Sequence, residues 1–399
     1  MKHILFVDDD QAVLDGLRDM LRKQRQRWVM TFVSSGEQAL AHLETNSVDL
    51  IVSDMRMPGM DGVALLTKVK ALYPETARIV LSGYAEREAV IGALPVAHQF
   101  LSKPCSSDTI CAVIERVCGL NALLQDLRVR RVIGSLSALP SLPQTYWEIT
   151  KAAQQPDVTL SALGDIVEKD PAITIKLLQL VNSSYFGLAH AQTSVRQSVS
   201  YLGTALLKGL ALTAHVFSTA SIPEVAGFSL EALQQHSVLV SRLARRLLTD
   251  RTRAETAFTA ALVHDIGKIV LAISLPERYA EVLRAIARTG RPDHVEELEV
   301  FGVTHAEVGA YLLGLWGLPL DIVEAVAYHH HPENALPTDT LIALHVADAL
   351  TYPPAGPTPD ASRNGRLQID VVENSPFGPE LTRWRILAEN ELFASRQSA

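Results

Sequence analysis

The stretch Ile4-Leu5-Phe6-Val7-Asp8-Asp9-Asp10 decides the fold of the first part of the chain. Four apolar residues followed by three carboxylates are typical of a short buried strand that ends at a polar edge of a sheet. Similar apolar runs occupy residues 28–33, 50–52, 79–81 and 100–101, and the segments between them carry apolar residues at helical spacing. This alternation predicts an α/β domain over residues 1–120, with a five-stranded, doubly wound parallel sheet and helices on both faces.

Polar side chains stand at the ends of four of these predicted strands: Asp8, Asp9, Asp10, Asp54, Ser82 and Lys103. Any one of them is open to the interpretation of a solvated loop residue. The carboxyl ends of parallel strands share one edge of a sheet, however, so that together they indicate a single charged cluster. Clustered carboxylates repel one another unless a cation joins them, and oxygen ligands suit Mg²⁺. A metal-bound carboxylate can attack phosphorus, while a lysine and a hydroxyl nearby hold the phosphoryl oxygens.

The motifs around these residues resemble those of the response-regulator receiver domain. They are residues 4–10, Asp54-Met55-Arg56-Met57-Pro58-Gly59-Met60-Asp61-Gly62, Leu81-Ser82-Gly83-Tyr84 and Phe100-Leu101-Ser102-Lys103-Pro104. The resemblance implies that Asp54 is the phosphoacceptor, phosphorylated by a cognate sensor histidine kinase. It also implies the remaining site residues: Mg²⁺ ligands Asp8, Asp9, Asp54 and the backbone carbonyl of Arg56, phosphoryl contacts Ser82 and Lys103, a switch position at Phe100, and a cis peptide before Pro104.

Apolar residues keep a helical rhythm from Thr109 to about Leu136, which predicts a helical connector over residues 121–138. Two interpretations stay open for this segment. It is either a continuation of the last receiver helix that acts as a spacer, or a helix whose apolar seam forms a homodimer or carries the signal.

The next part of the chain, residues 139–352, has an almost wholly helical pattern and predicts an all-α bundle. Asp170-Pro171-Ala172, residues 178–187 and Ser198-Val199-Ser200-Tyr201-Leu202-Gly203 resemble the HDOD domain, an HD-related output domain of bacterial signalling proteins. The usual role implied by this family is protein interaction.

Imidazoles and carboxylates are spread over several predicted helices of this domain: His236, His264, Asp265, His305, His329, His330 and Asp348. Helical bundles build metal sites from such side chains when they face a common centre. The arrangement looks like the metal set of HD-superfamily phosphohydrolases, including the type that degrades cyclic di-GMP. The resemblance implies Fe, Mn or Zn at these residues and a phosphate contact at Lys268.

Two departures from that phosphohydrolase pattern stand in the sequence. No Gly-Tyr-Pro motif follows His331, and Ala232 occupies a position where related diesterases can supply an acidic ligand. Three interpretations therefore stay open: hydrogen-bonded core imidazoles, metal binding without turnover, and phosphohydrolase activity. His190, His215, His294 and His345 are interpreted as ordinary hydrogen-bonded imidazoles.

Composition limits the function further. The formal net charge is −8 and neither half is basic, which argues against direct nucleic-acid binding. The absence of a long apolar run, the acidic start and three cysteines without a CxxC pair predict a cytoplasmic protein with free thiols and no membrane segment. Residues 353–399 read as a Pro/Gly-rich linker and an amphipathic helix, either docked on the domain or presented to a partner.

The sequence thus predicts a two-component response regulator whose phosphorylated receiver controls an HDOD domain that signals through contacts with downstream proteins. The alternative is a phosphorylation-regulated, metal-dependent phosphohydrolase acting on a cyclic dinucleotide or a nucleotide. A third class, a DNA-binding regulator, lacks both a basic balance and a recognisable basic recognition helix.

Overall fold

The computed structural model describes residues 1–83, 92–120, 127–136, 143–152, 158–183, 190–204, 225–351 and 367–398, with a few single positions between them. The described chain forms two compact units. The first comprises Met1–Ala138, Gln179–Ala191 and Gly314–Gly317, and the second comprises Leu139–Leu178, Gln192–Leu313 and Leu318–Ala399.

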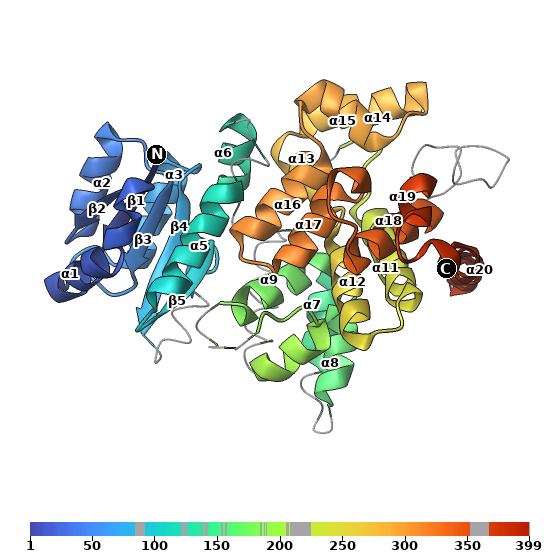
Figure 1. Cartoon of the computed structure of the whole chain (residues 1–399), viewed down its shortest axis with the longest axis horizontal. Helices are drawn as coiled ribbons and strands as arrows, with labels where there is room; N and C mark the ends of the chain where they lie inside the picture. The colour runs from blue at the N-terminus through green and yellow to red at the C-terminus, as the bar shows by residue number, and fades with distance from the viewer. Residues whose placement is uncertain are drawn as a thin grey trace. The chain divides into compact units, whose positions relative to one another are not determined.

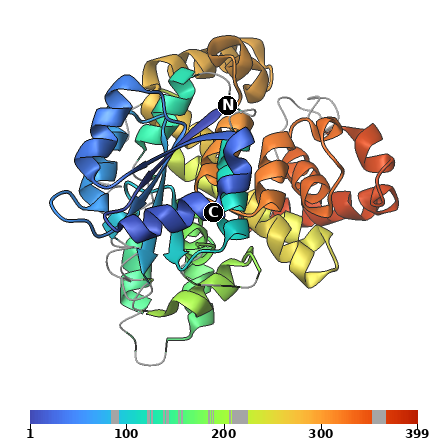
Figure 2. The same cartoon turned by 60° about the vertical axis from the view of Figure 1, so that its left-hand side comes forward.

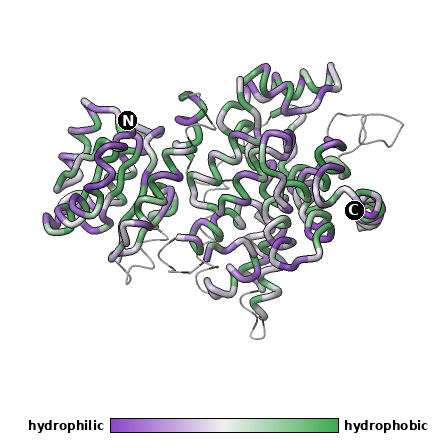
Figure 3. The backbone as a smooth tube through the Cα atoms, in the orientation of Figure 1, coloured by the Kyte–Doolittle hydropathy of each residue, from purple (hydrophilic) through white to green (hydrophobic). Residues whose placement is uncertain are grey.

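The first unit contains the predicted sheet. Its five strands are β1 (Lys2–Val7), β2 (Trp28–Val33), β3 (Leu50–Asp54), β4 (Ala77–Gly83) and β5 (Gln99–Lys103). They are all parallel and lie in the order β2-β1-β3-β4-β5, with helices on both faces (Figures 1 and 2). All residues of β3 are buried, and hydrophobic residues line the inner strands (Figure 3). The predicted doubly wound α/β fold is therefore confirmed.

The helices described in this unit are α1 (Gln11–Met20), α2 (Gly36–Thr45), α3 (Gly62–Leu72) and α5 (Ser107–Leu120), with a 3₁₀ turn, η1 (Arg22–Gln26). Three of them start at a side-chain cap, which satisfies a backbone N–H that the helix itself leaves unpaired. Asp10 accepts from Ala12 N at 2.8 Å and Asp61 from Ala64 N at 2.7 Å, while Ser35 caps α2. Each cap therefore fixes the residue at which its helix begins.

The predicted connector contains a separate helix, α6 (Leu127–Ser135). α5 ends at Leu120, and residues 121–123 and 125–126 lie outside the described part of the chain. Val129 and Ile133 are buried, and the Gly134 carbonyl accepts a 2.6 Å hydrogen bond from Nη2 of the buried Arg78. The apolar face of α6 is therefore buried within the first unit.

The second unit is largely helical in its described residues, as predicted. Its helices include α7 (Pro143–Ala152), α8 (Leu160–Val167), α9 (Pro171–Val181, which continues into the first unit), α11 (Leu230–Leu247), α12 (Arg251–Val263), α13 (Ile266–Ser274), α14 (Pro276–Thr289), α15 (Asp293–Phe301), α16 (His305–Leu315), α17 (Leu320–Tyr328), α18 (Asp339–Thr351), α19 (Ile369–Glu373) and α20 (Leu381–Ser398). His215 and the Pro/Gly-rich residues 353–360 lie outside the described residues.

One continuous stretch, Arg251–Ser274, is long and apolar enough to pass for a membrane span by length and composition. It consists of α12 and α13, joined by His264 and Asp265. Because 94% of its apolar window is buried inside the protein, it is a core helix pair of the bundle. This central position brings its polar junction into the middle of the domain.

The C-terminal helix α20 is docked on the bundle. Trp384 is fully buried and its Nε1 donates a 3.1 Å hydrogen bond to the Leu247 carbonyl, which satisfies the indole N–H. Leu381 and Ala388 are buried on the same face, whereas Ile386 is 56% exposed. Of the two interpretations of this helix, docking is the one that the structure shows.

Gly267 marks the tightest approach between α13 and α16. A Cβ at this position would lie 2.0 Å from the carbonyl oxygen of His305, so the two backbones touch. We expect Gly267→Ala to lower the free energy of unfolding by about 2–3 kcal/mol, the upper part of the range for overpacked cores. Urea denaturation followed by circular dichroism measures this loss.

Gly119→Ala is the matched control, because a Cβ there meets no atom within 4 Å. This control should be neutral or stabilising by about 0.5–1 kcal/mol, since alanine favours a helix over glycine. Equal stability of the two variants would contradict the close packing of α13 on α16.

Candidate functional sites

The receiver site is built by the carboxyl ends of β1, β3 and β5, which meet at one edge of the parallel sheet. Asp8 follows β1, Asp54 closes β3 and Lys103 closes β5. Nζ of Lys103 lies 2.6 Å from Oδ2 of Asp8 and forms an ion pair with Asp54. Oδ2 of Asp54 also accepts a 2.7 Å hydrogen bond from the backbone N–H of Arg56. The structure thus brings the predicted phosphoacceptor and the predicted lysine into contact.

Charge and burial are balanced at this edge. Burial raises the pKa of the Asp8 carboxyl, although its contact with Lys103 works in the opposite direction. Burial alone would lower the pKa of Lys103, but the contacts with Asp54 and Asp8 outweigh it and raise that pKa. The lysine therefore stays protonated beside two carboxylates at neutral pH.

The other predicted receiver residues divide into different roles. Asp9 is exposed next to the buried Asp8, whereas Asp10 caps α1. Phe100 is buried, and the peptide between Lys103 and Pro104 is cis, as predicted. Ser82 is buried and its Oγ has no hydrogen-bond partner among the described residues.

The donor set at this edge fits a magnesium ion and a phosphoryl group. Asp8, Asp9 and Asp54 supply hard carboxylate oxygens, the ligands that Mg²⁺ prefers. The unpaired hydroxyl of Ser82 is a donor that a phosphoryl oxygen would satisfy, because a buried hydroxyl without a partner is unfavourable. A receiver domain usually binds Mg²⁺, and the chemistry that the ion supplies is neutralisation of charge on the phosphoryl group.

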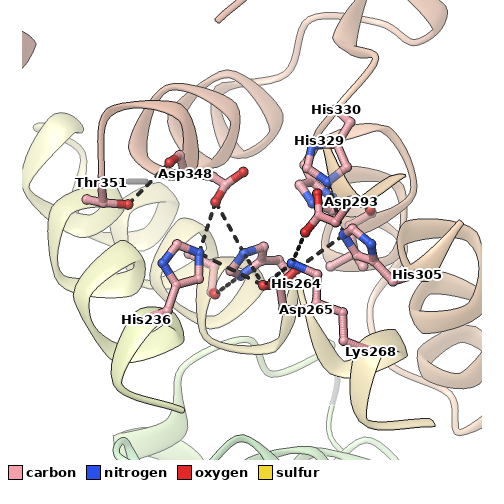
Figure 4. A network of polar contacts seen from close by, with 12 residues as sticks. His236, His264, Asp265, Lys268, Asp293, His305, His329, His330, Asp348 and Thr351 are labelled. Carbon is pink, nitrogen blue, oxygen red and sulfur yellow. Dashed lines mark hydrogen bonds and ion pairs between the residues drawn. The ribbon is translucent and has the colours of Figure 1, made fainter. Parts of the chain in front are cut away.

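The second site lies in the helical unit, where the seven predicted ligands converge with Lys268 (Figure 4). His236 comes from α11, His264 and Asp265 from the junction of α12 and α13, His305 from the start of α16, His329 and His330 from the end of α17, and Asp348 from α18. Five of the seven ligands lie at helix ends or junctions, and His236 and Asp348 lie within helices that face them.

Two histidines of the cluster are oriented by their own backbone. Nδ1 of His264 lies 2.6 Å from the Ala261 carbonyl, and Nδ1 of His329 lies 2.7 Å from the Val326 carbonyl. A carbonyl only accepts, so each Nδ1 carries the proton and each Nε2 carries a lone pair. Both Nε2 atoms are buried and have no hydrogen-bond partner among the described residues. This is the orientation of a metal-ligating imidazole.

Carboxylates complete the cluster. Nε2 of His236 lies 3.1 Å from Oδ1 of Asp348, and Nε2 of His305 lies 3.2 Å from Oδ1 of Asp265. Nζ of Lys268 lies 2.8 Å from Oδ2 of Asp265. Asp265 therefore stands between the His236 side and the His305 side, where one carboxylate can bridge two ions.

The site favours positive charge. Burial would lower the pKa of His264, yet the carboxylates of Asp265 and Asp348 outweigh it and raise that pKa. Burial would raise the pKa of Asp265, but His264 and Lys268 hold it well below its usual range. The field that draws a proton to Nε2 of His264 also draws a metal cation to the same lone pair.

The donor set therefore fits a transition-metal centre. Burial and neighbouring imidazoles hold the pKa of His329 and of His330 well below the usual range, so these rings are neutral and can donate a lone pair. Imidazole with carboxylate suits Fe, Mn or Zn. Six of the ligands form two groups of three. In the first group, one ligand atom each of His236, His264 and Asp348 lie within 4.8 Å of one another, and the same holds for His305, His329 and His330 in the second. The chemistry that such an ion supplies is Lewis-acid stabilisation of charge on a phosphoryl group.

Access to the cluster is narrow. His264, His305 and His329 are fully buried, and the most exposed ligand is His236, whose side chain is 17% exposed. Solvent therefore reaches the described cluster chiefly at the His236 side. Ala232, one turn before His236, is exposed and supplies no ligand.

The sequence interpretation missed the contribution of α15. Glu297 of this helix is fully buried, and its Oε2 lies 2.6 Å from Nδ1 of His305 and accepts a 2.7 Å hydrogen bond from the His305 backbone N–H. Asp293 lies 2.5 Å from Nζ of Lys268 through its Oδ2. The signal in the sequence is a pair of carboxylates four residues apart, which share one helix face.

Two histidines that the sequence analysis interpreted as hydrogen-bonded imidazoles, His345 and His294, differ in their hydrogen bonding. His345 is hydrogen-bonded at both nitrogens: Nδ1 lies 2.7 Å from the His329 carbonyl and Nε2 accepts from Gln368 N at 2.9 Å. For His294 the interpretation as a hydrogen-bonded imidazole is wrong at one nitrogen, because its Nδ1 is buried without a hydrogen-bond partner among the described residues.

Comparison with known proteins agrees with this architecture. Residues 4–115 match the response regulator receiver domain family and residues 139–332 match the HDOD domain family. The chain thus carries an N-terminal receiver domain and a C-terminal HDOD domain.

Individual relatives share parts of the chain. It is 26% identical over 213 residues to an uncharacterized protein of Treponema pallidum (52% of this chain, 41% of that protein). It is 35% identical over 126 residues to the hydrogenase transcriptional regulatory protein HoxA of Cupriavidus necator (31% of this chain, 26% of that protein). In both, the match spans less than half of the relative's length. A solved virulence factor (cj0248) of Campylobacter jejuni covers 67% of this chain and 99% of its own at 18% identity and a TM-score of 0.54, a likeness of fold alone.

Proposed function

We propose that this protein acts in the cytoplasm, that a cognate sensor histidine kinase phosphorylates its Asp54 in the presence of Mg²⁺, and that this modification controls signalling by the HDOD domain through contacts with downstream proteins. The observation that carries the proposal is the contact of Lys103 with both Asp54 and Asp8 at the carboxyl edge of the sheet.

The geometry supports a phosphoryl transfer to the carboxylate of Asp54. One carboxylate oxygen attacks phosphorus and the donor's bond to phosphorus breaks, so that an acyl phosphate forms. The Arg56 N–H holds Oδ2 of Asp54 at 2.7 Å, which orients the carboxylate. Lys103 balances the added negative charge, and Ser82 donates its free hydroxyl to a phosphoryl oxygen. A shift of Ser82 on β4 and of Phe100 on the neighbouring strand β5 then favours a second receiver state.

Protein contact is the output that the HDOD domain supports best. Its metal cluster is nearly closed, as the burial of His264, His305 and His329 shows. Its surface, in contrast, carries two large aromatic side chains, Trp147 and Tyr201, which are 60% and 51% exposed. Aromatic residues of this kind dominate the binding energy of protein interfaces.

Coupling between the domains is tested by hydrogen–deuterium exchange with beryllium fluoride and Mg²⁺ as the phosphoryl mimic. We expect altered exchange in the receiver and also in helices α7–α18 of wild type, because the receiver state biases the output domain. The Asp54→Asn protein should show neither change. A change confined to residues 1–120 of wild type would sink the proposed control.

A second candidate function is a metal-dependent phosphohydrolase acting on a cyclic dinucleotide or a nucleotide. The complete set of converging ligands favours it, together with Lys268, whose ammonium lies at the same centre and is suited to a phosphate. The two functions differ in one measurable property, the turnover of a phosphodiester by metal-loaded protein.

Among the proposed interactions, a homodimer formed through the connector helix α6 has the least support. Val129 and Ile133 of α6 are already buried in the first unit, although Leu127 is 56% exposed. We therefore assign α6 to intramolecular coupling.

A further inference from the structure

The first turn of α15 brings a group of potential metal ligands next to the cluster of seven ligands described above. Asp293 and His294 lie there, and His330 follows the end of α17. One ligand atom of each lies within 4.8 Å of those of the other two, and all three residues are buried. Asp293 and His294 belong to neither of the ligand groups formed around His264 and Asp265.

The two imidazoles of this group pack against each other. The rings of His294 and His330 stack with their centroids 4.2 Å apart and an interplanar angle of 21°. Nδ1 of His294 is buried and lacks a hydrogen-bond partner among the described residues, and it lies 3.8 Å from Oδ1 of Asp293. A buried imidazole nitrogen without a partner is unfavourable unless something fills its coordination.

Carboxylates and one lysine lie beside this group. Asp293 and Glu297 of α15 are buried, and the buried Lys268 pairs with Asp293 and with Asp265. Lys268 contacts Oδ2 of Asp293, while Oδ1 accepts the backbone N–H of His294 at 3.1 Å and faces Nδ1 of the same residue.

We propose that Asp293, His294 and His330 form an additional metal position, separate from the one centred on His264 and Asp265. Two imidazoles and one carboxylate suit a divalent transition ion such as Zn²⁺, Fe²⁺ or Co²⁺ and leave positions open for water or an anion. Lys268 lies between the two positions, because its ammonium pairs with Asp265 of the first and with Asp293 of the second. His330 adjoins both as well, because its Nε2 lies 3.0 Å from Nε2 of His305.

Titration with Co²⁺, followed by visible absorption and elemental analysis of the full-length protein, tests this position. Four proteins are compared: wild type, His294→Gln, His264→Ala and the double variant. We expect His294→Gln to bind one equivalent less than wild type while it keeps the equivalent that requires His264. His264→Ala should retain an equivalent that the double variant loses.

His331→Gln is the matched control. His331 adjoins His330 in sequence and its ring contacts that of His294 at 5.5 Å, but its side chain is exposed and pairs with Glu333. This variant should bind as many equivalents as wild type. The proposal is overturned if His294→Gln, folded by circular dichroism, binds the same number of equivalents as wild type with the same affinity, or if wild type binds none. Neither result bears on phosphorylation of Asp54, which is measured separately.

Discussion

Asp54→Asn protein is expected to take up no phosphoryl group from acetyl phosphate and Mg²⁺, whereas wild type becomes phosphorylated. The reason is chemical, because an amide oxygen is far less nucleophilic than a carboxylate and cannot form a stable acyl phosphate. The substitution keeps the shape of the side chain and can still accept the Arg56 N–H, while it loses the ion pair with Lys103. Intact-mass spectrometry measures the incorporation, which should fall to background.

Asp61→Asn is the matched control for this variant. Asp61 lies in the same loop and caps α3 by accepting from Ala64 N, a role that asparagine fills equally well. Its phosphorylation should equal that of wild type. Labelling of Asp54→Asn at the wild-type level would show that another residue is the acceptor, and the proposed receiver chemistry would then be wrong.

His264→Ala is expected to release the metal of the central cluster. Its Nε2 lies 3.5 Å from Oδ2 of Asp265 and 3.6 Å from Oδ1 of Asp348, so that an ion at this lone pair would be held by all three residues. The variant removes one imidazole from Asp265, which keeps His305 and Lys268, and from Asp348, which keeps His236. We expect elemental analysis to find at least one equivalent of iron, manganese or zinc fewer than in wild type.

Metal binding should also be visible as stability. A ligand at one hundred times its dissociation constant stabilises the native state by about 2.7 kcal/mol. A chelator should therefore lower the melting temperature of wild type and of the His331→Gln control, and should lower that of His264→Ala by less. Wild type that is offered these metals, binds none and ignores the chelator would leave the cluster as a hydrogen-bonded core.

The same pair of proteins separates the two candidate outputs. If metal-loaded wild type hydrolyses a phosphodiester such as bis(p-nitrophenyl) phosphate and His264→Ala does not, the phosphohydrolase gains support. Metal without turnover would agree with the narrow access at His236 and with signalling by protein contact.

Much of the receiver could be predicted because its information is local. Each strand is a short apolar run, and each key polar residue follows such a run directly, as Asp8 follows Val7. Once strands are parallel, their carboxyl ends must meet, and Lys103 therefore reaches Asp54 although the two are 49 positions apart. The unpaired hydroxyl of Ser82 was not predictable, since hydrogen bonding at that edge depends on side-chain packing.

For the connector and the C-terminal helix, the spacing of apolar residues predicts a helix but neither its ends nor what it packs against. One helical rhythm from Thr109 to Leu136 covers two helices, α5 and α6, because apolar spacing does not report a break between them. The apolar face of α20 left docking and presentation open. Burial of Trp384 against the Leu247 carbonyl decides between them, and that contact joins residues 137 positions apart.

The sequence by itself determined the two domain types, the order of their motifs and the residue types able to bind Mg²⁺, phosphate and a transition metal. Only the tertiary structure decided which nitrogens face inward and which residues of α15 join the cluster. Glu297 and Asp293 carry no motif, and they enter the site because α15 packs beside His305 and Lys268. The physical reason is that a lone pair acquires its direction from a backbone carbonyl or a packed neighbour, and those partners are set by the fold and not by position in the chain.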